Sequence, residues 1–512
     1  TSERGADHMS MQILDCTLRD GGYINDWKFG RKTIASILDK LSDARVDIIE
    51  CGFLTGMVKD EESSLFSGIQ EIERLLPKKK TSSMFVAMIA MGEKELHPDL
   101  LSPYDGKSIK GIRLTFHKGE IDKGIQWAKK IMKKGYLVFM QPVGTVFYTD
   151  MELLSLVEKM NDLKPYAFYI VDTLGSMYRN EVSHKFYLID ENMDPEIRLG
   201  FHPHNNLQLA FSNAQVLGKI QTKRELIIDS SVFGMGRGAG NLPTELITQY
   251  INRNIAAKYD VTRIMDVYDE YIAPIRKNFQ WGYAVPYHIA ASHVCHPNYA
   301  SYLLNKQTLT MKDIEKIIQA IPDGRRMLYD QELIRRLYKS FQSRRIDDSQ
   351  AFFEIKRLVS GRKVLLLTWD KALTLHYKWL MDFINRENPY VAAVNFLDVR
   401  FRVNACFITS HKRMDMISGE LFHQPQIRVI FTSNVPVEQI NGLCIDYDRY
   451  RDETWEEGEL SGEMACKLFY GCGAKEICLA GFWEERGLQA LSKEEQEKIH
   501  LMAPFQRRKE HV

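Results

Sequence analysis

Short runs of apolar residues recur along the first half of the chain, and each is followed by a longer stretch of mixed apolar and polar residues. Each run is nearly continuous in apolar character, as expected of a strand that is buried on both faces. The runs begin at Gln12, Val46, Ser83, Gly111, Tyr136, Ala167, Ile197 and Leu226. The intervals of about 20 to 35 residues are long enough for one helix with its loops. This alternation predicts a (β/α)8 TIM barrel over residues 11–285.

The apolar pattern changes twice after the predicted barrel. Residues 286–358 carry apolar positions at helical spacing among many charged residues, which predicts a helical extension covering the barrel. From residue 362 onward, short apolar runs again alternate with helical intervals. This second alternation predicts a C-terminal Rossmann-like domain, an open α/β fold, over residues 362–512.

Open parallel sheets bind ligands beyond the carboxyl ends of their strands. In the C-terminal domain the candidates at such ends are Thr368, Ser410, His411 and Ser433. No phosphate-binding fingerprint accompanies them. The sequence is equally compatible with a nucleotide or nucleotide-sugar pocket and with a purely structural or oligomerising module.

Composition narrows the classes of partner. The chain has 68 lysines and arginines against 67 aspartates and glutamates, so net charge gives no reason to expect nucleic acid or an anionic membrane. No apolar run reaches the roughly 20 residues of a membrane-spanning helix, and the N-terminal residues lack the apolar segment of a signal peptide. The eight cysteines have no zinc-ligand spacing, as expected of reduced, structural thiols. We expect a cytoplasmic homo-oligomer without nucleic acid or membrane partners.

Polar residues collect where the predicted barrel strands end, and active sites of this fold lie at that end of the barrel. In the first half of the barrel, Arg19 and Asp20 follow the first strand, Glu50 ends the second and His117 follows the fourth. In the second half, Gln141 follows the fifth strand, Asp172 and Thr173 end the sixth, and His202 and His204 end the seventh. Residues Arg237–Asn241 follow the eighth strand. Their shared location predicts that the barrel is an enzyme.

The sequence "FHPHNN" from Phe201 places two histidines at positions i and i+2. On a strand this spacing points His202 and His204 to the same side. If they face inward, both can bind one metal ion through imidazole nitrogens, with Asp20 as the carboxylate ligand from another strand. A pair of ordinary polar histidines is the alternative.

Three motifs together resemble one known family: "DCTLRDGG" at 15–22, "GFHPHNN" at 200–206 and "GMGRGAGNLPTE" at 234–245. They resemble the DRE-TIM metallolyases, which include hydroxymethylglutaryl-CoA lyase, the isopropylmalate and homocitrate synthases, and the 4-hydroxy-2-oxovalerate aldolases. The resemblance covers residues 11–285 and implies a divalent ion (Mn, Mg, Co or Zn) on Asp20, His202 and His204. Asn241 matches an asparagine that lies beside the metal or ligates it.

The same resemblance implies roles for further residues. Arg19 matches the arginine that stabilises enolate charge on the substrate oxygen, and Glu50 would orient it. Thr173 matches a hydroxyl-bearing position that contacts substrate, and Gly21 with Gly22 would let the backbone turn tightly beneath the metal.

Tyr23 departs from the family pattern. The bacterial aldolases carry at this place the histidine that acts as base for the substrate hydroxyl. Tyr23 could move that proton or donate a hydrogen bond, and His117 or a water molecule could take the role instead. A tyrosine that only packs at the barrel mouth is the remaining alternative.

The motifs also discriminate within the family. The glycine-rich loop at 234–241 has no cysteine, unlike hydroxymethylglutaryl-CoA lyase, and "RDGGY" lacks the Glu-Gln pair usual in the acyl-CoA condensing enzymes. The resemblance therefore implies an aldolase that makes or breaks a carbon–carbon bond between the enolate of pyruvate, or a related 2-oxo acid, and an aldehyde. The alternatives are an acyl-CoA-dependent condensing transferase and a non-catalytic binding protein.

Overall fold

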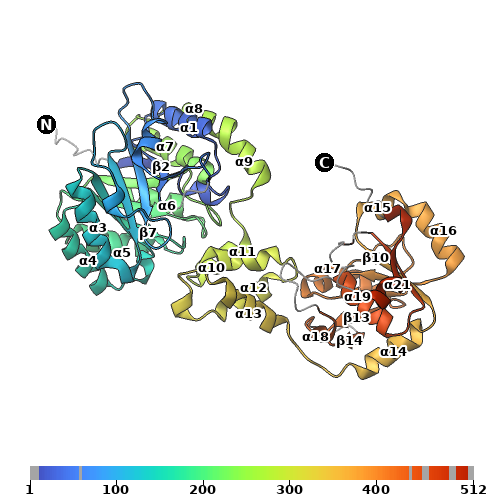
Figure 1. Ribbon diagram of the computed structural model, residues 1–512. Coiled ribbons are helices and arrows are strands. Elements are labelled where there is room, and N and C mark those ends of the chain that lie inside the picture. Colours follow the sequence, from blue (N-terminus) through green and yellow to red (C-terminus); the bar gives the residue numbers. More distant parts are fainter. Residues whose placement is uncertain are drawn as a thin grey trace. The chain divides into compact units, whose positions relative to one another are not determined.

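The computed structural model describes residues 11–56, 60–436, 441–451, 461–481, 483 and 492–505 (Figure 1). The chain forms two compact units, which are described separately. The first comprises Thr1–Ser301 with Pro322–Tyr329, and the second comprises Tyr302–Ile321 with Asp330–Val512. The helices predicted over residues 286–358 are thus divided between the two units. None of the described helices is long and apolar enough to cross a membrane.

The first unit is built on a closed barrel of parallel strands. In order around the barrel these are β1 (Met11–Asp15), β2 (Ile48–Leu54), β4 (Met84–Ala90), β5 (Gly111–Phe116), β6 (Leu137–Pro142), β7 (Ala167–Asp172), β8 (Arg198–Pro203) and β9 (Leu226–Ser230). The barrel closes because β1 pairs with both β9 and β2. A two-residue strand, β3 (Leu65–Phe66), pairs with β2 alone among the described strands. The predicted TIM barrel is confirmed.

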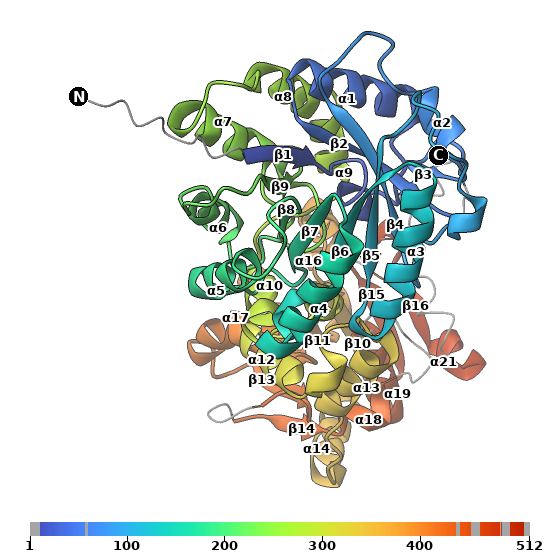
Figure 2. The same ribbon diagram turned by 90° about the vertical axis from the view of Figure 1, so that its left-hand side faces the viewer.

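Helices surround the barrel strands, as Figure 2 shows for α3 to α7. They are α1 (Arg31–Asp43), α2 (Ile69–Glu73), α3 (Ile121–Lys133), α4 (Asp150–Leu163), α5 (Arg179–Asp190), α6 (Ala210–Leu217), α7 (Thr244–Asn254) and α8 (Val261–Val267). Each buries one apolar stripe against the strands. In α3 the buried positions Gly124, Trp127, Ala128 and Ile131 follow the helical period, so one face meets the barrel. The opposite face stays polar.

Further helices follow the barrel. They are α9 (Ala273–Asn278), α10 (Val285–Ser292), α11 (Pro297–Asn305), α12 (Met311–Gln319), α13 (Gln331–Gln342) and α14 (Ser349–Val359). Their amphipathic sequences agree with the helical period predicted for this stretch. Residues 296–298, at the start of α11, lie at the mouth of the barrel within the first unit.

The second unit is built on an open sheet of parallel strands. They are β10 (Lys363–Thr368), β11 (Tyr390–Val394), β12 (Ala405–Ile408), β13 (Arg428–Thr432), β14 (Leu443–Ile445), β15 (Glu476–Ala480) and β16 (Ile499–Leu501). Their order in the sheet is β14-β13-β12-β11-β10-β15-β16. Chain progression therefore reverses between β10 and β15. This is the doubly wound arrangement that the apolar pattern predicted.

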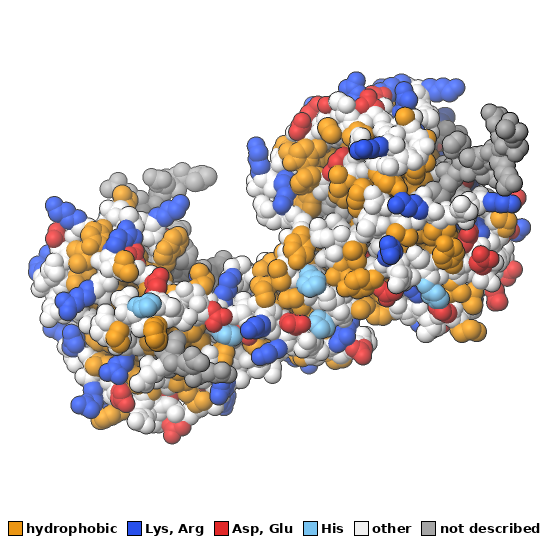
Figure 3. Space-filling model, turned by 180° about the vertical axis from the view of Figure 1, so that it is seen from behind, with side chains coloured by type: hydrophobic (Ala, Val, Ile, Leu, Met, Phe, Trp, Pro, Cys, Tyr) orange, Lys and Arg blue, Asp and Glu red, His pale blue; other side chains and the backbone are white. Residues whose placement is uncertain are grey.

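Helices cover both faces of this sheet. Alternate β10 residues face opposite sides, so Val364 and Leu366 pack with α14, α18 (Tyr447–Tyr450) and α19 (Ser461–Gly471). Leu365 and Leu367 pack with α15 (Lys371–Leu375), α16 (Tyr377–Glu387) and α17 (His411–Phe422). The loops at the carboxyl ends of the strands are thereby held between two rigid layers. On the face shown in Figure 3, basic and acidic side chains are interspersed over both units.

Candidate active site

The mouth of the barrel contains a cavity of about 250 Å³. Its walls come from the loops after the barrel strands and from residues 296–298 and 327–329. Predicted site residues that line it are Arg19, Asp20, Tyr23, His117, Thr173, His202 and His204. The other two predicted residues, Glu50 and Asn241, are buried and do not form part of the lining.

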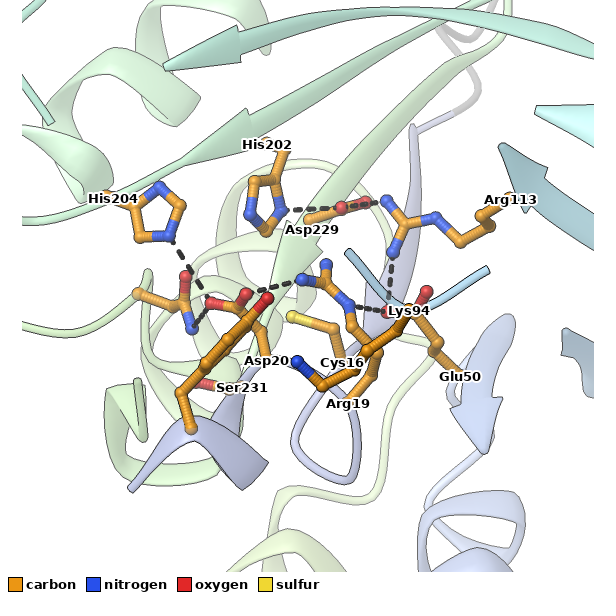
Figure 4. Close-up of polar contacts among 12 residues, drawn as sticks. Cys16, Arg19, Asp20, Glu50, Lys94, Arg113, His202, His204, Asp229 and Ser231 are labelled. Atoms are coloured by element: carbon orange, nitrogen blue, oxygen red, sulfur yellow. Dashed lines mark hydrogen bonds and ion pairs between the residues drawn. The ribbon is translucent and has the colours of Figure 1, made fainter. Parts of the chain in front are cut away.

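The two histidines converge with Asp20, as Figure 4 shows. His202 lies at the end of β8 and His204 follows it, and their ring centroids are 4.9 Å apart. Nε2 of His204 lies 3.4 Å from Oδ2 of Asp20. One ligand atom from each of the three residues lies within 4.8 Å of the others. At this spacing a single divalent ion can contact all three.

Hydrogen bonds fix the second nitrogen of each imidazole ring. Nδ1 of His204 lies 3.0 Å from the backbone carbonyl oxygen of Asp172, which can only accept, so Nδ1 carries the hydrogen. Nδ1 of His202 lies 2.8 Å from the Asp229 carboxylate. Burial acts to raise the pKa of Asp229, but Arg113 outweighs it and holds the pKa below its usual range. With hydrogens on Nδ1, both rings keep an Nε2 lone pair, which metal binding requires.

Asp20 and Asn241 supply oxygen atoms beside the two imidazoles. Burial acts to raise the pKa of Asp20, but Arg19 and His204 hold it well below its usual range, so the carboxylate is charged. Asn241 donates from Nδ2 to Asp20 over 2.7 Å. Its Oδ1 is buried and lacks a hydrogen-bond partner among the described residues. Such an orphaned oxygen is costly, and a cation beside Asp20 would supply the missing partner. These donors fit a divalent metal ion.

Arg19 is held in place by two carboxylates. Its Nε donates to Glu50 over 2.9 Å, and its Nη1 donates to Asp20. Glu50 also accepts from Arg113 over 2.7 Å, and Arg113 donates to Asp229. Removing one partner from a buried ion pair costs about 3 to 5 kcal/mol, so this network fixes the guanidinium rigidly. Glu50 therefore holds Arg19 in place and does not itself line the cavity.

The two glycines after Asp20 do not serve the purpose expected of them. Neither has a left-handed φ, so the turn does not depend on their backbone freedom. A Cβ on Gly22 would lie 2.0 Å from the Trp27 ring, whereas a Cβ on Gly21 would lie 3.1 Å from the Met235 side chain. Trp27 donates from Nε1 to the backbone oxygen of Arg19 over 2.8 Å. Gly22 thus makes room for a tryptophan that supports the arginine, and Gly21 packs closely against Met235.

Tyr23 lies at the rim of the cavity. Its hydroxyl donates to Oε1 of Glu93 over 2.8 Å. The Arg237 guanidinium carbon lies 3.8 Å from the centre of its ring, and the Trp27 ring lies 4.7 Å away. Burial raises the pKa of Tyr23 above its usual range. A phenolate is therefore disfavoured, and the hydroxyl can act as a hydrogen-bond donor or as a relay to Glu93.

His117 and Thr173 both present side chains to the cavity. The backbone N–H of His117 donates to Glu120 over 3.0 Å, which fixes the start of the following helix. Oγ1 of Thr173 accepts from the backbone N–H of Gly144 over 2.9 Å. Because that oxygen accepts, its own hydrogen remains free to point at a bound molecule.

His296 is a cavity residue to which the sequence pattern gave no role in the site. Its Nδ1 accepts from the backbone N–H of Asn298 over 3.1 Å. Burial, together with the nearby positive charge of Arg237, lowers the pKa of His296 to about 3. The ring is therefore neutral, carries its hydrogen on Nε2 and can donate it to a ligand.

Comparisons with known proteins found a matching family model and similar enzymes. The HMGL-like family model matches residues 117–270. A 4-hydroxy-2-oxovalerate aldolase from Thermomicrobium roseum is 29% identical over 271 residues, which span 52% of this chain and 73% of that enzyme. Another from Geobacillus thermodenitrificans is 27% identical over 278 residues, spanning 51% of this chain and 76% of its own length.

A solved structure has the same fold. The N-terminal domain of a candidate aldolase from Bacteroides vulgatus superimposes with a TM-score of 0.51 at 24% sequence identity, covering 60% of this chain and all of that domain. Over its barrel, where the three motifs assemble at one mouth, this chain is thus similar to the HMGL-like, or DRE-TIM metallolyase, superfamily.

Proposed function

We propose that the barrel is a divalent-metal-dependent aldolase acting on the enolate of pyruvate, or a related 2-oxo acid, and an aldehyde. The observation that carries this proposal is the convergence of Asp20, His202 and His204 beside a rigidly held Arg19. The names of the similar enzymes support the same reaction class. The proposed ligands of the ion are these three residues, with Asn241 as a further oxygen donor.

The chemistry follows from the charges in the cavity. Cleavage removes the proton of the substrate hydroxyl, breaks the adjacent carbon–carbon bond, releases the aldehyde and leaves an enolate. A bound divalent ion would act as a Lewis acid toward the substrate's oxygens. Arg19 adds a fixed positive charge where negative charge develops, and it cannot be deprotonated. Thr173 and His296 can each donate a hydrogen bond to substrate oxygens, while Tyr23 with Glu93 is the proposed route for the hydroxyl proton.

Pyruvate release tests this function directly. Purified protein with Mn²⁺ and 4-hydroxy-2-oxovalerate should release pyruvate, which lactate dehydrogenase and NADH report. A panel of aldehydes with pyruvate would then identify the preferred partner in the forward direction. An acyl-CoA condensing transferase would instead release free CoA thiol from acetyl-CoA and a 2-oxo acid. Thiol release without pyruvate release would contradict the aldolase.

Arg19→Lys should lower kcat by about 10² or more while the protein stays folded, because lysine keeps a charge but loses the planar fork. One ammonium group cannot reproduce the separate bonds to Glu50 and Asp20. The measurement is steady-state pyruvate release, with the metal content and melting temperature of the variant as controls. Near-normal turnover would show that Arg19 is structural.

Three further assignments belong to the same proposal. We place the enzyme in the cytoplasm, a choice supported by eight cysteines that are all free thiols. We also propose that it forms homo-oligomers, which sedimentation would test. For the second unit we propose a nucleotide or nucleotide-sugar ligand.

A further inference from the structure

The second unit contains a cavity of about 860 Å³ at the carboxyl ends of its strands. It is lined by residues that follow β10, β11, β12 and β15, together with residues 305–308. It therefore lies where the strand order reverses between β10 and β15. Ligands of open parallel sheets bind at this switch point, and the volume falls within the range of roughly 300 to 1,000 Å³ typical of small-molecule sites.

Two helices begin at this cavity and one arginine faces it without a carboxylate partner. Ser410 caps α17, and its side chain accepts from the backbone N–H of Arg413. Ser461 is the first residue of α19. Arg413 also lines the cavity and forms no ion pair with any described residue. A cation next to the amino ends of two helices is suited to bind a phosphate group.

Two tryptophans add aromatic surface to the cavity wall. Trp369 follows β10, lines the cavity and is 67% exposed, which is unusual for so large an apolar ring. Trp483 follows β15 and also lines the cavity, and its indole N–H is buried without a partner in the part of the chain that the structure describes. Exposed aromatic rings beside a phosphate site are suited to stack on a nucleobase.

Hydrogen bonds of Asn395 fix the cavity wall next to β11. Asn395 follows β11 with a φ of 59°, a left-handed value that is uncommon for a residue other than glycine. Its side chain donates to Oγ of Ser461 over 2.8 Å and to Oγ1 of Thr409 over 3.0 Å. Its Oδ1 accepts from the backbone N–H of Thr409 over 2.9 Å. This network holds the ends of β11 and β12 and the start of α19 in fixed positions around the cavity.

The charges that line the cavity restrict how much negative charge the ligand can carry. Lys306 and Arg413 are balanced by Glu420 and Glu463, so the wall does not favour a long polyanion. A carboxylate can accept hydrogen bonds from the vicinal hydroxyls of a ribose. We propose that this cavity binds a nucleoside monophosphate or diphosphate, with the phosphate at Ser410 and Arg413 and the base against Trp369. This inference does not depend on the aldolase reaction of the barrel.

Titration of the full-length protein with nucleotides tests the proposal. The probes are CMP, UMP, AMP and GMP with their 5′-diphosphates, followed by calorimetry and by tryptophan fluorescence. At least one probe should bind with one site per chain and quench the fluorescence. Trp369→Ala and Arg413→Met should each raise its Kd by about tenfold or more, because each removes a stacking or charge-assisted contact.

Two residues on α16 and α17 that do not line the cavity provide matched controls. Lys412→Met removes a charge next to Arg413, and Trp379→Ala removes an exposed ring from α16; neither residue lines the cavity. Both controls should keep Kd within about twofold. The proposal is overturned if no probe binds at about 5 mM, if the site variants behave like the controls, or if pyrophosphate alone binds as tightly as the best nucleotide. Because these residues lie outside the barrel, pyruvate release by the variants should be unchanged.

Of the four ligand contacts expected from the sequence, two line this cavity. Thr368 and Ser410 are part of its wall. His411 instead lies 2.8 Å from the Asp313 carboxylate, and Ser433 donates to the backbone oxygen of Arg344. The latter two therefore have structural roles in the second unit.

Discussion

Asp20→Ala and His202→Ala will each remove both the bound metal and the activity of the barrel. Purified wild-type protein should hold about one divalent ion per barrel, because the proposed ligand atoms of Asp20, His202 and His204 lie within 4.8 Å of one another. Alanine at either position leaves only two of the three converging ligands. Metal content after exhaustive dialysis, measured by plasma mass spectrometry, and pyruvate release are the two readouts.

His184→Ala is the matched control for this experiment. His184 is an exposed histidine on α5 that pairs with Asp150 and does not line the cavity. Its variant should keep both metal and turnover. Full activity of chelator-treated, metal-free protein would contradict the metal-dependent mechanism, and restored turnover on adding Mn²⁺ to chelated wild-type protein would support it.

Strand positions could be predicted because barrel and doubly wound strands are buried on both faces, so their sequences stay apolar over four to seven residues. Strands β3, β14 and β16 were missed because they are only two or three residues long. An apolar run of that length is as common in loops as in strands. The convergence of Asp20, His202 and His204 could also be predicted, since the barrel fold itself restricts chemistry to the strand ends.

The supporting network was harder to predict, although two residues carried a signal. Arg113 lies inside the run "GIRLTF" and Asp229 inside "LIIDSSVF". A charge within a strand buried on both faces must find a partner of opposite sign, so these two could have been paired from sequence. Glu93 and His296 lacked such a signal, because they come from loops whose course is set by tertiary packing rather than by periodicity.

Tyr23→Phe should slow cleavage by about 10² to 10⁴ if the hydroxyl relays the substrate proton. The reaction must remove a proton that Arg19 cannot accept. The Tyr23 hydroxyl lines the cavity and donates to Glu93, so it can take the substrate proton while passing its own to that carboxylate. Phenylalanine keeps the ring contacts with Trp27 and Arg237, so the site should stay intact.

Two further measurements separate a relay from a disturbed site. The Tyr23→Phe variant should keep its metal and should still exchange the methyl protons of pyruvate with solvent deuterium, because Arg19 and the metal ligands are untouched. Glu93→Gln should slow cleavage to a similar extent, since it removes the carboxylate that accepts the relayed proton. Loss of both cleavage and exchange would indicate a damaged site. Unchanged cleavage in both variants would move the proton transfer to His117, His296 or a water molecule, leaving the tyrosine to pack at the barrel mouth.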